Sequence, residues 1–243
     1  MNFIVKKGAS LRGEINIPGD KSMSHRAIML ASLSEGRCEI TGLLEGEDCL
    51  ATIEVFRKMG VRISSNSGNY YIEGNGLKGL KQPVEPLDFG NSGTSIRLCA
   101  GVLAAQNFAT TLVGDGSLSS RPMQRIIEPL TLMSAKISSS EDGTLPLLIQ
   151  PTDSLESIEY SLPIASAQVK SCIMFASLYA KGETKIIEEA ITRNHTETMF
   201  NAFGIPVKIS TSDNSRIISL SGIESIKSTN IDICGDFSSA SFF

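Results

Sequence analysis

Strand-like and helix-like hydrophobic patterns follow one another in a fixed order along this chain. Short segments with alternating polarity indicate half-buried strands, and longer apolar segments with helical spacing indicate helices. The first complete set consists of a strand at 14–17, a helix at 22–33, a strand at 37–41, a helix at 49–59 and a hairpin of strands at 61–63 and 70–72. We expect Asp48 to cap the second helix and Gly60 to end it. A further short strand is predicted at 3–5.

The same order of elements then occurs twice more. The second set is predicted as strand 87–89, helix 98–105, strand 109–113, a helix that starts at 120–122 with Pro122 in its first position and runs through 132–133, and strand 135–137. The third set is predicted as a strand from 159, helix 171–179, strand 184–187, helix 196–203 and strand 205–209. Aligning the sets places Arg26, Arg97 and Lys170 in one column, at a period of about 72 residues. This period fits a βαβαββ unit, so we predict an α/β (α+β) fold of three such units.

A fourth copy begins at 231–239, where the sequence is similar to 15–23, and the chain stops at Phe243 inside the expected apolar helix. An apolar helix that is only half present has nothing to cover it, so we expect this chain to be the N-terminal part of a longer protein. The predicted division is 1–13 with another domain, 14–228 as the three-unit domain (units 14–80, 81–153 and 154–228), and 229–243 as the start of a second domain.

Composition narrows the possible functions. The chain has 243 residues, 41% of them hydrophobic and 20% charged, with a net charge of −4, which is typical of a soluble globular protein and argues against general nucleic-acid binding. We find no apolar run long enough to span a membrane and no signal peptide. The five cysteines are widely spaced without a CxxC pair, which favours reduced thiols in the cytoplasm over disulfides or zinc. The GxGxxG match at 74–79 has no helix after it, so we reject a dinucleotide cofactor.

The segment from Gly19 to Arg26 has the features of an anion site. It lies between a strand and a helix, where free backbone N–H groups and the helix dipole favour negative charge, and Lys21 and Arg26 add two cations. Arg121 stands at a predicted helix start, which is unfavourable for a cation unless an anion binds there. For Arg97 and Lys170 the sequence leaves both ligand contact and a structural ion pair open.

The two histidines, His25 and His195, are the other tempting acid–base groups. We interpret both as non-catalytic, and two histidines do not make a metal site, so no metal is predicted.

Five motifs resemble the enolpyruvyl transferases, and within that family the branch that acts on shikimate 3-phosphate. They are PGDKSMSHR at 18–26, DFGNSGT at 88–94, SSRPM at 119–123, SAQVKS at 166–171 and RNHTE at 193–197. The resemblance implies two domains, each of three βαβαββ units around a pseudo-threefold axis, with the substrates between them. It also implies a cytoplasmic enzyme of aromatic amino acid biosynthesis, monomeric at full length, that needs no cofactor and is a target of glyphosate.

The resemblance further implies transfer of the enolpyruvyl group of phosphoenolpyruvate to the 5-hydroxyl of shikimate 3-phosphate, with release of phosphate. The residues implied for shikimate 3-phosphate are Lys21, Ser22, Arg26, Ser166, Ala167, Gln168 and Arg193. Those implied for phosphoenolpyruvate are Lys21, Gly93, Arg121 and Gln168, with Lys21 also catalytic. The family's general base lies in the other domain, so we expect this chain to bind shikimate 3-phosphate without turnover. Two alternatives stay open: the related transferase for a UDP-amino sugar, and a non-catalytic module that binds phosphorylated ligands.

Overall fold

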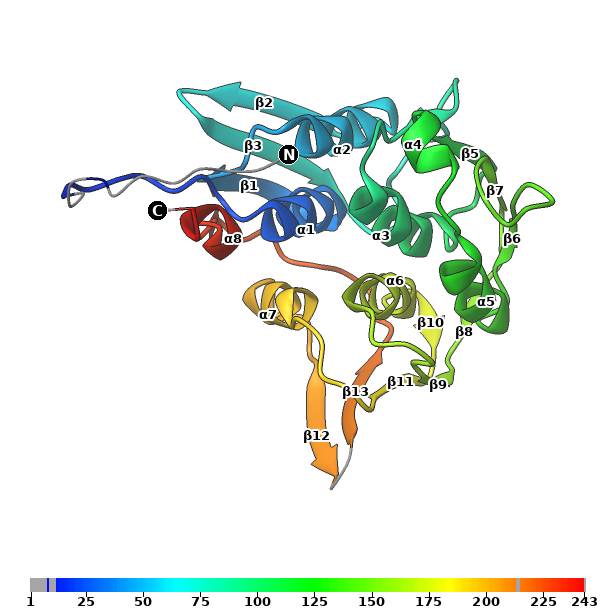
Figure 1. The fold of residues 1–243 in the computed structure, drawn as a ribbon. Coiled ribbons are helices and arrows are strands. Elements are labelled where there is room, and N and C mark those ends of the chain that lie inside the picture. Colours follow the sequence, from blue (N-terminus) through cyan, green and yellow to red (C-terminus); the bar gives the residue numbers. More distant parts are fainter. Residues whose placement is uncertain (1–7, 9–11, 213–214, 243) are drawn as a thin grey trace.

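The computed structural model describes residues 8, 12–212 and 215–242, and it contains three four-stranded sheets with helices packed between them (Figure 1). The first unit comprises α1 (Lys21–Leu33), β1 (Glu35–Thr41), α2 (Glu47–Lys58), β2 (Arg62–Asn66) and β3 (Asn69–Asn75). The predicted strand at 3–5 lies outside the described residues.

The second and third units repeat this order. The second comprises β4 (Leu87–Asp88), α3 (Gly93–Leu103), β5 (Thr110–Val113), a short α4 (Gly116–Ser119), α5 (Gln124–Leu132), β6 (Lys136–Ser138) and β7 (Leu147–Gln150). The third comprises β9 (Glu159–Ser161), α6 (Ala167–Ser177), β11 (Glu183–Glu188), α7 (His195–Ala202), β12 (Lys208–Ser212) and β13 (Ser215–Ser221). A small parallel pair, β8 (Leu155–Glu156) with β10 (Ala180–Lys181), joins the second unit to the third. The predicted three-unit architecture is therefore confirmed.

The three sheets share one strand order, and the first sheet obtains its outer strand from the end of the chain. The orders are β4-β5-β7-β6 and β9-β11-β13-β12, in which the first strand of each unit runs parallel to its neighbour. In the first sheet, β14 (Ile231–Asp232) takes that place, parallel to β1. The strand predicted at 14–17 is therefore wrong, since those residues form no strand. The assignment of 229–243 to a second domain stays a prediction.

The helices α1, α3 and α6 lie side by side in the middle of the molecule, and the three sheets lie around them (Figure 1). Most of their residues are fully buried, which explains the long apolar runs in the sequence. The closest approach is between α3 and α6: a Cβ added at Gly101 would lie 2.2 Å from the carbonyl oxygen of Cys172. Within the described part of the chain, the helices are all too short or too polar to cross a bilayer.

Helix ends differ from the predictions at two positions that bear on the site. Asp48 does not cap α2; the N-cap is Gly46, and Asp48 lies in the first turn. Pro122 does not begin a helix either, because α5 starts at Gln124 after a separate short helix α4. Gly60 ends the α2 segment as predicted, with a positive φ of 86° that a side chain would strain.

Candidate anion-binding site

The first turns of α1, α3 and α6 are each capped by a side chain that accepts from the backbone N–H three residues later. Asp20 accepts from Met23 at 2.8 Å, Ser92 from Ser95 at 3.3 Å, and Ser166 from Val169 at 3.3 Å. These caps satisfy one of the free N–H groups of each helix and leave others for a ligand. The three chain segments with the predicted anion pattern are therefore three helix starts.

A cavity of about 500 Å³ opens between α1, α6 and the loop that precedes α7. Its lining residues are Ser22, Arg26, Thr94, Ala165, Ser166, Ala167, Gln168, Ile191, Thr192, Arg193 and His195. Six of the predicted shikimate 3-phosphate residues, all except Lys21, are in this set. None of these lining residues is Asp or Glu, so the wall supplies cations, hydroxyls and helix N–H groups without an opposing carboxylate.

Only 3% of the surface of Arg26 is exposed, and its hydrogen-bond partners are uncharged groups. Its guanidinium donates to the Thr196 hydroxyl at 2.6 Å, the Ser171 hydroxyl at 2.7 Å and the Ser22 carbonyl at 2.8 Å. Burial lowers the pKa of Arg26 to about 10, with the Glu197 carboxylate as the main opposing influence, so the group stays charged at neutral pH. Three of its five N–H donors are occupied by these bonds, and the others are free to bind an anion.

Lys21 and Ser22 lie in the first turn of α1 and have different partners. The Ser22 carbonyl accepts a hydrogen bond from Arg26, whereas the Lys21 side chain contacts a carboxylate. The Lys21 ammonium forms an ion pair with Asp48, and its side chain is about half exposed, at 49%. Asp48, predicted as a helix cap, is therefore the counter-ion of a predicted catalytic lysine. Sequence patterns do not reveal this pair, because Asp48 reaches Lys21 only through the packing of α2 beside α1.

Arg97 and Gln168 connect the starts of α3 and α6. The Arg97 guanidinium donates to the Gln168 side-chain oxygen at 2.9 Å, and the Gln168 amide donates to the Thr94 hydroxyl at 3.0 Å. Burial and the nearby cations Arg121 and Arg125 lower the pKa of Arg97. Among the described residues no carboxylate lies within ion-pair distance of Arg97, so the structural ion pair considered for this residue is not formed.

Gly93 lies between two of these guanidinium groups. A Cβ added there would lie 2.9 Å from Nη1 of Arg97 and 3.0 Å from Nη1 of Arg121. Arg121 itself donates to the Asn91 side chain and, at 3.2 Å, to the Ser117 hydroxyl, while the Asn91 amide donates to Asp115 at 2.8 Å. Gly93 therefore leaves open a position that both cations face, as a small anion requires.

Lys170 lies at the equivalent position of the third unit but is closed off from ligands. Its ammonium is fully buried, 3.1 Å from Glu188 and 2.8 Å from Glu197. Arg216 adds longer contacts to the same two carboxylates. Of the two possibilities left open by the sequence, the structural ion pair is the one that the structure shows.

The two histidines have different environments. His25 is buried, with its Nδ1 2.8 Å from the Thr52 hydroxyl, and burial lowers its pKa to about 3, so the ring is neutral and structural. His195 lies in the wall of the cavity. Partial burial lowers its pKa, although the nearby Asp20 carboxylate acts to raise it.

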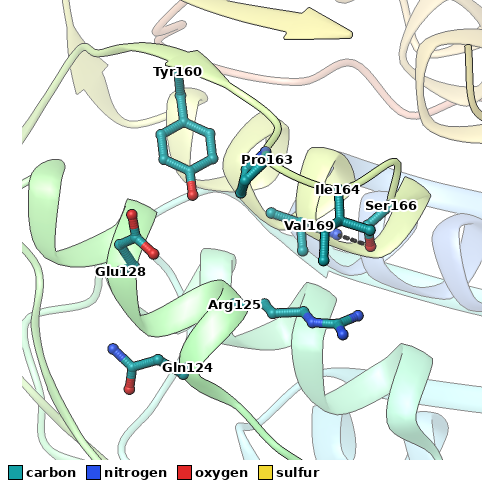
Figure 2. A pocket seen from close by; sticks show the side chains of 8 residues that line it. All are labelled: Gln124, Arg125, Glu128, Tyr160, Pro163, Ile164, Ser166 and Val169. Atoms are coloured by element: carbon teal, nitrogen blue, oxygen red, sulfur yellow. Dashed lines mark hydrogen bonds between the residues drawn. The ribbon is translucent and has the colours of Figure 1, made fainter. Parts of the chain in front are cut away.

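A second, smaller cavity adjoins the site through Ser166 (Figure 2). The side chains of Tyr160, Pro163, Ile164 and Val169 line one side of it, and the polar side chains Gln124, Arg125 and Glu128 of α5 line the other (Figure 2). Sequence reasoning gave no role to Arg125, Thr94 or Thr192. Arg125 and Thr192 lie outside the five motifs, and Thr94, although it is in the DFGNSGT motif, is not a cation.

Three repeated units whose capped helix starts lie in the central layer form an α/β domain of the kind found in the enolpyruvyl transferase class. The chain belongs to the EPSP synthase (3-phosphoshikimate 1-carboxyvinyltransferase) family, whose family model matches residues 5–243. It is 52% identical over 245 residues to the 3-phosphoshikimate 1-carboxyvinyltransferase of Hydrogenovibrio crunogenus and 51% identical over 242 residues to that of Methylococcus capsulatus.

A solved structure supports the same assignment. The EPSP synthase from Acinetobacter baumannii superimposes with a TM-score of 0.89 at 50% identity, covering 95% of this chain and 51% of that chain. The two relatives in sequence are covered to 55% and 54% of their length. The chain thus spans about half the length of the proteins that it matches.

Proposed function

We propose that this chain forms the shikimate 3-phosphate-binding part of an enzyme that transfers the enolpyruvyl group of phosphoenolpyruvate to the 5-hydroxyl of shikimate 3-phosphate. The observation that carries the proposal is the cavity wall, which combines helix starts and the arginines Arg26 and Arg193 without a lining carboxylate. Both substrates carry phosphate and carboxylate groups, so converging cations are needed to bind them and to stabilise the leaving phosphate.

The proposed roles are those that the family resemblance implies, and the cavity lining supports those given to the shikimate phosphate. Arg26, Ser22 and Arg193 hold the shikimate phosphate, together with the N–H groups at the start of α6, where Ser166, Ala167 and Gln168 lie. Lys21 reaches both substrates and stabilises developing charge as the catalytic cation. Gly93 and Arg121 bind phosphoenolpyruvate at the start of α3, with Gln168 between the two sites.

The proposed reaction is an addition followed by an elimination. The 5-hydroxyl oxygen bonds to the enol carbon while the methylene carbon gains a proton, and the hydroxyl proton leaves to a base. The bond from the same carbon to the phosphate oxygen then breaks, and the methyl group returns a proton. The family resemblance implies that the general base lies outside this chain, and a cavity lining without carboxylates fits that expectation; we therefore expect the chain alone to bind without turnover.

Calorimetric titration and complementation test the proposal. The chain should bind shikimate 3-phosphate, and phosphate release should appear only after the remaining half of the protein is added. Binding of a UDP-amino sugar instead would favour the related transferase, and binding with no release after complementation would favour a non-catalytic module. Release by the chain alone at rates typical of the whole enzyme would contradict the division of roles.

Location and assembly are further parts of the proposal. All five cysteines are free thiols and four of them are buried, which fits a reducing compartment. We therefore place the protein in the cytoplasm, as a monomer at full length, without nucleic-acid or membrane partners. Size-exclusion chromatography with light scattering checks the oligomeric state.

A further inference from the structure

The loop of residues 189–194, between β11 and α7, carries Arg193 into the wall of the cavity. Arg193 is exposed, and Ile191 beside it is 72% exposed. Apart from the cap at Asn194, the hydrogen bonds found among the described residues include only one made by this loop. The Thr192 hydroxyl donates it to Oε1 of Glu188 at 2.5 Å.

The acceptor of this bond is unusually well fixed. Glu188 is the last residue of β11 and is fully buried, and the Lys170 ammonium lies 3.1 Å from Oε1 and 3.2 Å from Oε2. Lys170 in turn contacts Glu197 at 2.8 Å, on the first turns of α7. A buried ion pair with several partners holds its groups in one geometry, because any displacement leaves a charge without compensation.

We propose that Thr192 is a positioning residue, which fastens the Arg193 loop to the buried Lys170–Glu188 pair and thereby sets where Arg193 meets the phosphate of the ligand. This inference rests on the proposed function. It gives the fully buried ion pair a role in the site. The pair is a fixed point for Arg193, which makes no hydrogen bond or ion pair to any other described residue. Arg26 needs no such anchor because three hydrogen bonds hold its guanidinium directly.

The substitution Thr192→Val removes the hydroxyl, keeps the branched shape and leaves the buried charges in place. We expect the Kd for shikimate 3-phosphate to rise about tenfold, since small misplacements of a binding group are costly. Thr192→Ser keeps the donor and should bind like the unmodified chain. Thr131→Val is the matched control, because it removes a hydroxyl that donates to the Ile127 carbonyl on α5, away from the cavity.

A double-mutant cycle separates positioning from general loosening. If Thr192 acts through Arg193, then Thr192→Val should weaken binding in the unmodified chain but add nothing in an Arg193→Ala background. Unchanged affinity of Thr192→Val, or an equal further loss in the Arg193→Ala background, would overturn the inference.

Backbone order parameters measured by NMR relaxation without ligand give a readout independent of the proposed function. Thr192→Val should lower the order parameters of residues 189–193 toward the values of a flexible segment and leave those of the central residues of α7 unchanged. Equal order parameters for the loop in both proteins would overturn the anchor even if binding changed. If the unmodified chain binds no shikimate 3-phosphate, the proposed function of this chain fails, and the relaxation experiment still decides whether the loop is anchored.

Discussion

Arg26 and Lys170 are two buried cations at matching positions of the repeated pattern, yet their surroundings give them different tasks. Arg26 in α1 is 3% exposed and donates to two hydroxyls and a carbonyl, all uncharged. Lys170 in α6 is fully buried and lies between two carboxylates. Among the described residues no carboxylate forms an ion pair with Arg26, so its positive charge can attract an anion in the cavity. The charge of Lys170 is paired with two carboxylates and is not available to a ligand.

This difference shows that the repeat fixes where a cation lies and its neighbours decide what it does. A charge with neutral partners retains its attraction for an anionic ligand, whereas a charge paired with carboxylates contributes mainly to the geometry of the fold. Substitutions at the two positions should therefore affect different quantities, stability for Lys170 and ligand affinity for Arg26.

The largest expected effect is on stability, from Lys170→Met. Removing the ammonium leaves Glu188 and Glu197 buried with only the longer contacts to Arg216, and breaking a buried pair in this way costs about 3–5 kcal/mol. Arg26→Met should cost less, about 1–3 kcal/mol, because the orphaned Thr196 and Ser171 hydroxyls can still bond to each other at 2.6 Å. Urea unfolding of both variants measures the difference.

Lys185→Met is the control for that experiment, since Lys185 pairs with Glu159 at 3.9 Å on the surface. Its unfolding free energy should change by less than about 1 kcal/mol. Equal losses for Lys170→Met and Arg26→Met would contradict the comparison.

The sequence alone could predict the repeat but not the partners of its cations. Arg26, Arg97 and Lys170 align because each lies near the start of an apolar helix. The carboxylates of Lys170 lie 18 and 27 residues further along the chain, and only the folded third unit brings them to it. The start of each helix also varies, because the capping residues Asp20, Ser92 and Ser166 stand in three successive columns of the alignment.

The wrong strand at 14–17 has a physical explanation of the same kind. Residues 15–17 and 231–233 have nearly the same alternating pattern, and only one segment can pair with the free edge of β1. Residues 231–232 occupy that edge, and the Ile233 N–H donates to the Thr41 carbonyl at 2.9 Å. Local pattern favours both segments equally, so the choice depends on how the rest of the chain is connected.

The next largest effect is on ligand affinity, from Arg26→Lys. The charge is kept, but the planar fork that donates to Thr196, Ser171 and a phosphate together is lost. Losing one charged hydrogen bond to the ligand corresponds to roughly a 10–100-fold rise in the Kd for shikimate 3-phosphate. Calorimetric titration measures it, and Lys185→Arg, which changes a surface lysine in the same way, should leave the Kd within about twofold.

A smaller and more selective effect is expected from Gly93→Ala. The added Cβ would lie 2.9 Å and 3.0 Å from the guanidinium nitrogens of Arg97 and Arg121, so both arginines must shift by a few tenths of an ångström. We expect the affinity for phosphoenolpyruvate, measured with shikimate 3-phosphate present, to fall about tenfold. Shikimate 3-phosphate should bind nearly as before, because the added Cβ approaches neither Arg26 nor Arg193. An equal loss for both ligands would show that the two subsites are not separate.

The smallest expected effect is a pH dependence of stability from His25, next to Arg26 in α1. Burial lowers the pKa of His25 from its ordinary 6.5 to about 3, so the unfolded chain binds a proton between these values and the folded chain does not. Stability from this residue is therefore complete above pH 6.5 and is lost as the pH falls toward 3, by about 1 kcal/mol between pH 6.5 and 5.5. His25→Gln keeps a polar group beside Thr52 and should remove this share of the slope, as urea unfolding at the two pH values measures.

The corresponding positions of the other units are the apolar Ile96 and Val169, so His25 has the place of a core residue rather than of a proton donor. An unchanged slope in the variant would mean that the ring is protonated in the folded chain, which would add a second cation beside Arg26 and weaken the contrast with Lys170.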